Sequence, residues 1–324
     1  MIFNKRIRRR WSPAVPGVAG PSVGAVIATL TTLAIAASLL VACAAAAVKR
    51  ADSPGTLRVV AAESVWGSIA AQLGGPRVTV RNIIESPAVD PHDYEPTADD
   101  ARAMALADVV VVNGLGYDPW ARALLAPGAL GRRVVVDVGH VVGGHLGDNP
   151  HRWYNPDDVR AVAGAITAAY QQVNPAQSAY FAQRLTWFET TALGEYHRLI
   201  AEIRTKFSGT PIGASESIFE MLVPALGLDL LTPPGFLRAI SEGTEPTTAD
   251  RRTATRQLAD HAVRLYLYNS QNATPEVRDQ VALARREGIP VVSMTEMLSP
   301  PSATYQAWQT TQLRALLDAL EQTR

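Results

Sequence analysis

The sequence contains a single cysteine among its 324 residues, Cys43. One cysteine excludes an internal disulfide bond. An excess of charge of one sign is also missing, because 30 Lys and Arg residues balance 30 Asp and Glu residues. Nucleic acid is therefore not an expected partner, since phosphate neutralisation needs clustered Lys and Arg. The hydrophobic share of 47% is sufficient for the core of one or two domains.

Several catalytic motifs are missing as well. There is no HExxH, which argues against a zincin protease, and no GxxxxGK[ST] or strand-following GxGxxG, which argues against nucleotide binding. The segment GASES at 213–217 has a serine but lacks the final glycine of the GxSxG nucleophile elbow. The sequence therefore gives no motif support to these enzyme classes.

The first 43 residues have the layout of an export signal. MIFNKRIRRR carries five basic residues and no acid, and an apolar run over 23–42 leads to LVAC at 40–43. LVAC resembles a bacterial lipobox, which implies that Cys43 is lipidated and becomes the mature N-terminus. The alternative is an uncleaved anchor, because about 20 apolar residues can span a bilayer. Both interpretations place the body of the protein outside the cytoplasm and tethered to the membrane.

Removal of the leader changes the charge balance. Its five basic residues are taken from 30, which leaves 25 basic against 30 acidic residues and a net charge of −5. The predicted mature part is thus mildly acidic, which again disfavours nucleic acid as a partner.

Strand-like and helix-like segments alternate on both sides of a long helical stretch. Apolar runs such as VTVRNII and DVVVVNG alternate with amphipathic segments, which indicates parallel sheets built from βαβ units. We therefore predict an α/β fold with two lobes, each with a parallel-type sheet flanked by helices, joined by one long connecting helix. The predicted segments are a signal peptide and lipobox at 1–43, a tether at 44–55, an N-terminal α/β lobe at 56–174, the connecting helix at 175–208 and a C-terminal α/β lobe at 209–324.

Two histidines stand in closely similar settings. His92 lies in DPHDYEP and His151 in NPHRWYNP, and each follows a proline in a loop after a predicted strand region. Proline restricts the loop, and ligands of open α/β sheets bind near the carboxyl ends of strands. Imidazole is a common metal ligand near neutral pH. The two histidines could thus meet at one metal ion, or they could be two ordinary loop histidines.

Three acids surround His92 in the segment SPAVDPHDYEPT, namely Asp90, Asp93 and Glu95. They could orient the imidazole ring or provide a negative field that attracts cations. The alternative is that they only keep the loop soluble and cap neighbouring backbone.

DPHDYEPT followed by NPHRWYNP resembles the metal-binding lipoproteins of bacterial ABC importers for zinc and manganese. The resemblance covers nearly all of residues 57–320, including the long helix. Members of that family hold their ion with four protein ligands, two from each lobe. The resemblance implies that the metal ligands are His92, His151, Glu216 in GASESIF and Glu296 in VVSMTEMLSP. At the position that corresponds to Glu296 many relatives have Asp, and Glu is longer than Asp by one methylene group.

Such a ligand set combines two imidazoles with two carboxylates, which neutralise a divalent cation. Imidazole suits zinc, and carboxylate suits harder ions such as manganese. Zinc specialists of the family often carry a His-rich loop, which this chain lacks, whereas the Irving–Williams order favours zinc. The sequence therefore predicts one divalent transition metal ion, zinc or manganese, without deciding between them. Four ligands that close the shell leave no open position for water, which favours capture over catalysis.

The resemblance implies a lipid-anchored, extracytoplasmic binding protein that is not an enzyme. It would capture the ion between its lobes, act as a monomer and deliver the ion to an ABC permease and its ATPase. An alternative from another class is a surface lipoprotein that acts in cell adhesion or metal buffering without a permease. A metallohydrolase is a more distant alternative, because it needs an open coordination position.

Overall fold

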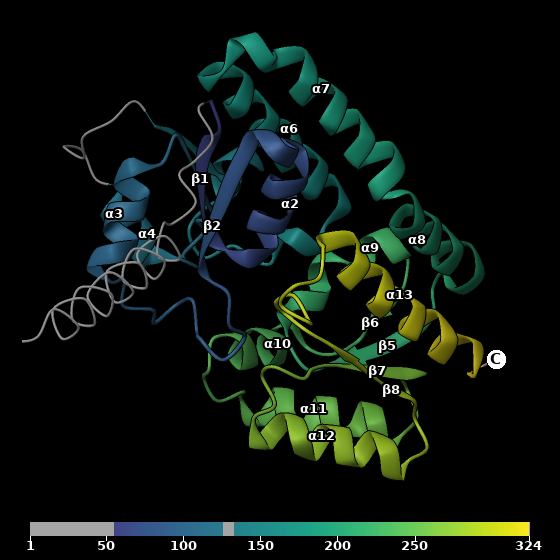
Figure 1. Ribbon diagram of the computed structural model, residues 1–324. Coiled ribbons are helices and arrows are strands. Elements are labelled where there is room, and N and C mark those ends of the chain that lie inside the picture. The colour runs from purple at the N-terminus through teal and green to yellow at the C-terminus, as the bar shows by residue number, and fades with distance from the viewer. Residues whose placement is uncertain (1–54, 126–132, 324) are drawn as a thin grey trace, which may run out of the picture. The chain divides into compact units, whose positions relative to one another are not determined.

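The computed structural model describes residues 55–125 and 133–323 (Figure 1). Cys43, the predicted export signal and all but the last residue of the predicted tether lie outside this range. None of the helices within the described range is both long and apolar enough to cross a membrane.

The first lobe is built on a four-stranded sheet in which all neighbouring strands are parallel, in the order β2–β1–β3–β4. The strands in this order are Val78–Ile84, Leu57–Glu63, Val109–Val112 and Val134–Asp137. All four valines of β3 are buried, which explains why this strand is apolar without alternation. A central strand of a parallel sheet is covered on both faces and is apolar at every position, as β3 is here.

Helices cover both faces of this sheet. Val109 and Val111 of β3 belong to a cluster with α2 and α6, whereas Val110 and Val112 pack with residues of α3 and α4. This alternation follows from the two-residue period of side chains along a strand. The four helices are Ser64–Gly74 (α2), Pro156–Val173 (α6), Ala98–Leu106 (α3) and Pro119–Leu124 (α4).

The second lobe repeats the plan with the order β6–β5–β7–β8, again with parallel neighbours. Its strands in this order are Asp229–Leu230, Pro211–Ala214, Leu265–Asn269 and Val291–Met294. One face packs against three helices, of which α11 and α12 contact each other (Figure 1). These helices are Pro234–Ser241 (α10), Thr248–Ala259 (α11) and Pro275–Arg286 (α12). The prediction of two parallel sheets flanked by helices is confirmed.

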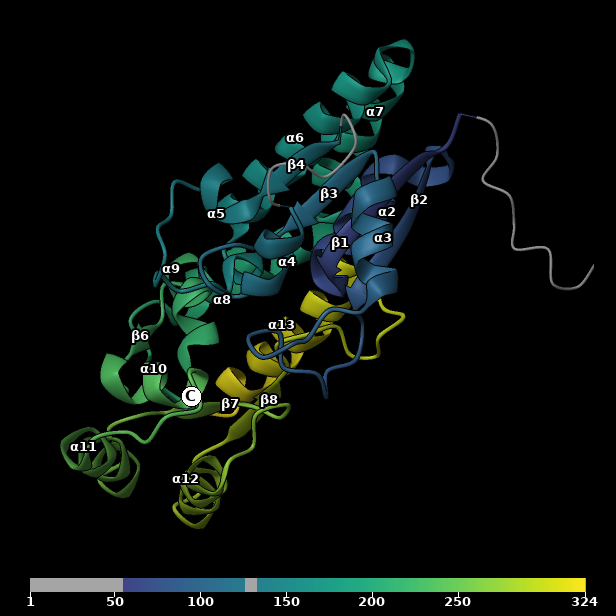
Figure 2. The ribbon, with the colours of Figure 1, turned by 90° about the vertical axis from the view of Figure 1, so that its left-hand side faces the viewer.

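The segment between the lobes is helical but is not one regular α-helix. After a 3₁₀ turn at Pro175–Gln177, α7 covers Ser178–Trp187, a π-helical turn covers Phe188–Ala192, and α8 covers Gly194–Phe207. The Leu193 amide donates to the carbonyl of Phe188 at 2.9 Å, five residues back, as a π-turn requires. Figure 2 shows α7 running alongside α6 of the first lobe.

The other end of this segment belongs to the second lobe, where α8 packs against the C-terminal helix α13, Tyr305–Glu321. Arg314 of α13 pairs with Glu195 of α8 at 2.9 Å. The first residue of α13 also reaches the first lobe, because the Tyr305 amide donates to Ser68 Oγ of α2 at 2.9 Å. Two helical segments therefore bridge the lobes.

A single apolar cluster runs through both lobes. It contains Val111 of the first sheet, Leu199 of α8, and Leu267 of the second sheet, all at most 1% exposed. A contiguous contact cluster of this kind defines one core. Further short helical segments are Gly75–Arg77, Val138–Val141 (α5), Arg152–Tyr154, Ser217–Met221 and Val223–Leu226 (α9).

Candidate metal centre

All four predicted ligands follow the ends of strands. The loop after β2 carries His92, and the segment after β4 and α5 carries His151. In the second lobe Glu216 follows β5, and Glu296 follows β8. Since the strands of a parallel sheet all end at one edge, each lobe places two of these side chains on the same side.

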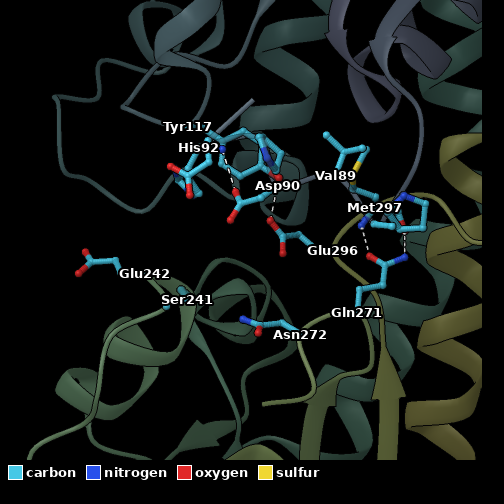
Figure 3. A pocket seen from close by; sticks show the side chains of 15 residues that line it. Val89, Asp90, His92, Tyr117, Ser241, Glu242, Gln271, Asn272, Glu296 and Met297 are labelled. Atoms are coloured by element: carbon cyan, nitrogen blue, oxygen red, sulfur yellow. Dashed lines mark hydrogen bonds between the residues drawn. The ribbon is translucent and has the colours of Figure 1, made fainter. Parts of the chain in front are cut away.

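Two cavities lie where these edges meet. One, of about 580 Å³, is lined by His92, Tyr117 and Glu296 together with Glu242 and Asn272 of the second lobe (Figure 3). The other, of about 300 Å³, is lined by His92 and His151 as well as Glu220 and Arg238. His92 borders both cavities, which places it at the boundary between them.

Hydrogen bonds fix the orientation of the exposed His92. Its amide donates to Asp90 Oδ1 at 2.9 Å, so this acid holds the loop backbone. Its Nδ1 lies 3.2 Å from the Gly116 carbonyl oxygen. Because a carbonyl oxygen can only accept, Nδ1 carries a proton, and in the neutral ring Nε2 keeps a free lone pair. That is the tautomer a metal ligand needs.

His151 is buried and is fixed in the same way by Asn149. Asn149 Oδ1 accepts from the His151 amide at 3.0 Å and from its Nδ1 at 2.9 Å. The side-chain nitrogen of Asn149, Nδ2, donates across the cleft to the Ser217 carbonyl at 2.7 Å and to Glu220 Oε2 at 3.1 Å. Asn149 thus holds Nδ1 of His151, leaves Nε2 facing Glu296, and joins the two lobes directly behind the ring.

Glu296 makes a second contact between the two lobes within the site. Its Oε1 lies 3.3 Å from His151 Nε2 and accepts a hydrogen bond of 2.7 Å from the Tyr117 hydroxyl. Burial alone would raise the pKa of Glu296, but the contacts with His151 and Tyr117 and the charge of His92 outweigh it and lower the pKa. Glu296 is therefore ionised at neutral pH.

Glu216 is 1% exposed and is held by two asparagines. Asn269 donates to its Oε1, and Asn272 donates to its Oε2 at 2.7 Å. The same Asn269 amide lies 3.3 Å from Glu296 Oε2, so it bridges the two acids. Burial and the negative charge of Glu296 raise the pKa of Glu216 to about 8. One carboxylate of the pair is thus charged and the other is mostly neutral at pH 7.

The four residues therefore lie around one cleft without forming a closed shell. His151 and Glu296 are in direct contact, Glu216 is joined to Glu296 through Asn269, and the His92 ring lies 5.0 Å from that of Tyr117. Over residues 55–125 and 133–323, no three His, Cys, Asp or Glu side chains are arranged to hold an ion. An ion would have to take the place of the hydrogen bonds that now occupy Glu296 and Glu216.

The donor set suits a divalent cation. In each imidazole Nδ1 is committed to a hydrogen bond, so a metal would bind through Nε2, which in His151 now contacts Glu296. The ionised Glu296 supplies one negative charge, and a proton leaving Glu216 supplies the second. Two charges match those of a divalent ion, so the pair would bind it without residual charge.

Sequence reasoning missed Tyr117, Asn149, Asn269 and Asn272. Tyr117 follows β3, Asn269 ends β7 and Asn272 lies three residues beyond it. These three residues lie next to strand ends, as His92 does, so the same signal could have identified them from the sequence. Asn149 directly precedes the Pro-His pair of His151, and only the folded chain reveals its contact with the second lobe.

A pair of buried acids lies beneath the Tyr117 loop. Asp118 accepts hydrogen bonds from the amides of Asn113 at 2.7 Å and Gly114 at 2.8 Å, and burial raises its pKa to about 6. Glu63, at the end of β1, has no hydrogen-bond partner for either oxygen within the described structure. Burial and the charge of Asp118 raise the pKa of Glu63 well above its usual value.

Comparison with known proteins agrees with this architecture. Residues 59–319 match the family model described as zinc-uptake complex component A periplasmic. The manganese ABC transporter substrate-binding lipoprotein PsaA of Streptococcus anginosus is 25% identical over 250 residues, which cover 72% of this chain and 78% of that protein. The iron ABC transporter substrate-binding lipoprotein MtsA of Streptococcus pyogenes serotype M1 is 33% identical over 85 residues, 26% of this chain and 27% of its own.

Solved structures share the fold. An S38A mutant of the manganese-bound periplasmic metal binding protein of candidatus liberibacter asiaticus superposes with a TM-score of 0.69 at 18% identity, covering 82% of this chain and all of that one. A mutant of the laminin-binding adhesin of Streptococcus agalactiae has a TM-score of 0.68 at 20% identity and covers 82% of this chain and 99% of its own. Because the family model spans most of the sequence, the chain belongs to the zinc-uptake complex component A periplasmic family.

Proposed function

We propose that this chain is an extracytoplasmic solute-binding lipoprotein that captures one divalent transition metal ion between its lobes and delivers it to an ABC permease. The observation that carries the proposal is the contact between His151 of the first lobe and Glu296 of the second, 3.3 Å apart in a cleft also bordered by His92. The names of relatives such as PsaA, a manganese ABC transporter lipoprotein, support a transport role.

In this proposal the ligands are His92, His151, Glu216 and Glu296, and the ion is zinc or manganese. Metal binding would replace the hydrogen bond between His151 Nε2 and Glu296 Oε1 with bonds from both groups to the ion, and the proton that Nε2 donates in that hydrogen bond would leave. It would also expel the proton of Glu216. Around a four-coordinate ion such as zinc, four protein groups leave no vacant position for a substrate water, which supports a carrier and not an enzyme.

Elemental analysis of purified residues 44–324, together with titrations of zinc and manganese into the stripped protein, tests the proposal. We expect one equivalent of metal, and a loss of affinity greater than about a hundredfold in His92→Ala and in His151→Ala, because each removes a ligand. His197→Ala is the matched control, since His197 lies on α8 and lines neither cavity of the cleft. Stoichiometric binding by the His92→Ala/His151→Ala double variant would disprove the ligand assignment.

The proposed partners and location have separate tests. A lipid on Cys43 should be visible in the mass of the mature N-terminal peptide, and Cys43→Ala should release the protein from membranes. Light scattering should give the mass of a monomer. Co-purification with a membrane permease and its ATPase would support delivery. A protein that binds metal but associates with neither would instead favour the adhesion or buffering role.

A further inference from the structure

Tyr117 occupies the centre of the candidate site although it is not one of the proposed ligands. Its side chain is fully buried, and its ring lies edge-on to those of His92 at 5.0 Å and His151 at 5.9 Å. Its hydroxyl donates to Glu296 Oε1 at 2.7 Å, across from the first lobe to the second. One side chain of the first lobe thus contacts three of the four proposed ligands.

The backbone around Tyr117 holds it in place. Gly114, Leu115 and Gly116 all have positive φ, at 69°, 60° and 97°, and the Tyr117 amide donates back to the Gly114 carbonyl at 2.9 Å. A leucine in the left-handed region is uncommon and persists only where the surroundings hold it. Asp118 supplies that hold by accepting from the amides at the start of the turn.

The same turn also orients His92, whose Nδ1 bonds to the Gly116 carbonyl. The positions of the Tyr117 hydroxyl and the His92 ring are therefore set by one rigid loop. Displacement of this loop would move both groups together. Tyr117 is thus built into the site in the same way as the ligands themselves.

The hydrogen bond from Tyr117 limits how Glu296 can bind an ion. It occupies one lone pair of Oε1, whose other side faces His151 Nε2 at 3.3 Å. The other oxygen, Oε2, faces the Asn269 amide at 3.3 Å. A tyrosine hydroxyl carries its proton at neutral pH, so it remains a donor to Glu296. Held in this way, Glu296 offers a single oxygen toward the imidazole of His151.

The number of carboxylate oxygens matters for the choice of ion. Zinc in protein sites is usually four-coordinate and tetrahedral. Manganese prefers six ligands that are rich in oxygen, and a carboxylate that binds through both oxygens helps to provide them. A single-oxygen Glu296 with two imidazoles favours the lower coordination number.

We propose that Tyr117 is a positioning residue that holds Glu296 as a single-oxygen ligand and thereby favours a four-coordinate ion such as zinc over manganese. This inference rests on the proposed function, because it presumes that Glu296 binds the ion. It concerns selectivity between ions, whereas the proposed function concerns binding itself, so the two can fail separately.

The test compares zinc and manganese affinities of the full-length protein and of Tyr117→Phe, which keeps the ring and removes the hydroxyl. We expect zinc affinity to fall by about ten- to hundredfold, the usual effect of losing an outer-shell partner. Manganese affinity should change less than about threefold, so the zinc-to-manganese ratio falls. Tyr170→Phe is the matched control, because it removes a buried hydroxyl that bonds to the Ala70 carbonyl at 2.9 Å, within the first lobe.

Cobalt gives an independent readout, since its visible absorption is strong in four-coordinate sites and weak in six-coordinate ones. Wild-type protein loaded with cobalt should absorb strongly, and Tyr117→Phe should absorb weakly. Glu296→Asp provides a second route if Tyr117→Phe folds poorly. The shorter acid withdraws from the hydroxyl, so it should lower the zinc-to-manganese ratio without a change at Tyr117.

Each outcome decides something. An equal loss for both metals, or an unchanged ratio in Tyr117→Phe with unchanged cobalt absorption, would overturn the positioning role while leaving the proposed function intact. Failure of the wild-type protein to bind either metal would overturn the proposed function and the inference with it. A changed ratio in the Tyr170→Phe control would also contradict the inference, because the effect would not be specific to the cleft.

Discussion

Metal affinity should weaken as the pH falls through the pKa of Glu216. Burial and the charge of Glu296 raise this pKa to about 8, so below that pH the metal-free protein holds a proton that the ion must displace. Each pH unit below the pKa then lowers the metal affinity by a factor of about ten. Affinity at pH 7 should therefore be about tenfold lower than at pH 8.5, which corresponds to about 1.4 kcal/mol.

Competition against a chelator of known pH dependence measures this change. Calorimetry in two buffers with different ionisation enthalpies counts the protons released per ion, and Glu216 should contribute about one of them near pH 7. Work above pH 7 limits the contribution of imidazole protonation, which is general for histidine ligands. The affinity and the proton count are independent measurements of the same event.

Glu216→Gln tests whether Glu216 causes the pH dependence of metal affinity, because an amide side chain does not titrate in this range. The variant should bind more weakly and lose the slope between pH 7 and pH 8.5. Glu220→Gln is the control, since Glu220 is another partly buried acid that lines the smaller cavity, and this variant should keep the slope. A wild-type affinity that does not change over this range, or a Glu216→Gln variant that keeps the slope, would refute the reasoning.

Three further predictions concern other groups. Asn149→Ala should lower metal affinity by about ten- to hundredfold in the same titration, because it releases Nδ1 of His151. Glu63→Gln should raise the free energy of unfolding in urea by roughly 1 kcal/mol at pH 8 and leave it unchanged near pH 4. Burial raises the pKa of Glu63 in the folded state. The preference of the folded state for protonated Glu63 therefore contributes stability at low pH, and this contribution is lost as the pH rises. Metal at about 1,000 times its Kd should add about 4 kcal/mol to the free energy of unfolding, and no metal-dependent shift in Tm would contradict this.

The sheets were predictable because their strands have simple patterns. Runs such as VVVV in β3 are apolar at every position, which only a doubly covered parallel strand requires. The π-turn at Phe188–Ala192 was not predictable, because its residues continue the helical pattern and its hydrogen bond is a matter of local geometry.

Two signals in the sequence predicted the site, namely positions after strand ends and the family resemblance. Neither signal predicts the contacts between the lobes. His92 and His151 carry a local signal, namely the preceding proline and the strand-following loop. The bonds from Tyr117 to Glu296 and from Asn149 to Ser217 join residues 179 and 68 positions apart. No local pattern encodes such contacts, because they arise when the two lobes are packed together.

The core that runs through both lobes has a consequence for the resistance of the chain to proteolysis. Because Val111, Leu199 and Leu267 belong to one cluster, neither lobe can unfold without exposing apolar surface of the other. The two lobes should therefore unfold together, and proteases that attack only unfolded chain would find no half-folded form. An ion bound at the cleft should then protect both lobes to the same extent, so the metal-loaded protein should resist proteolysis longer than the metal-free protein.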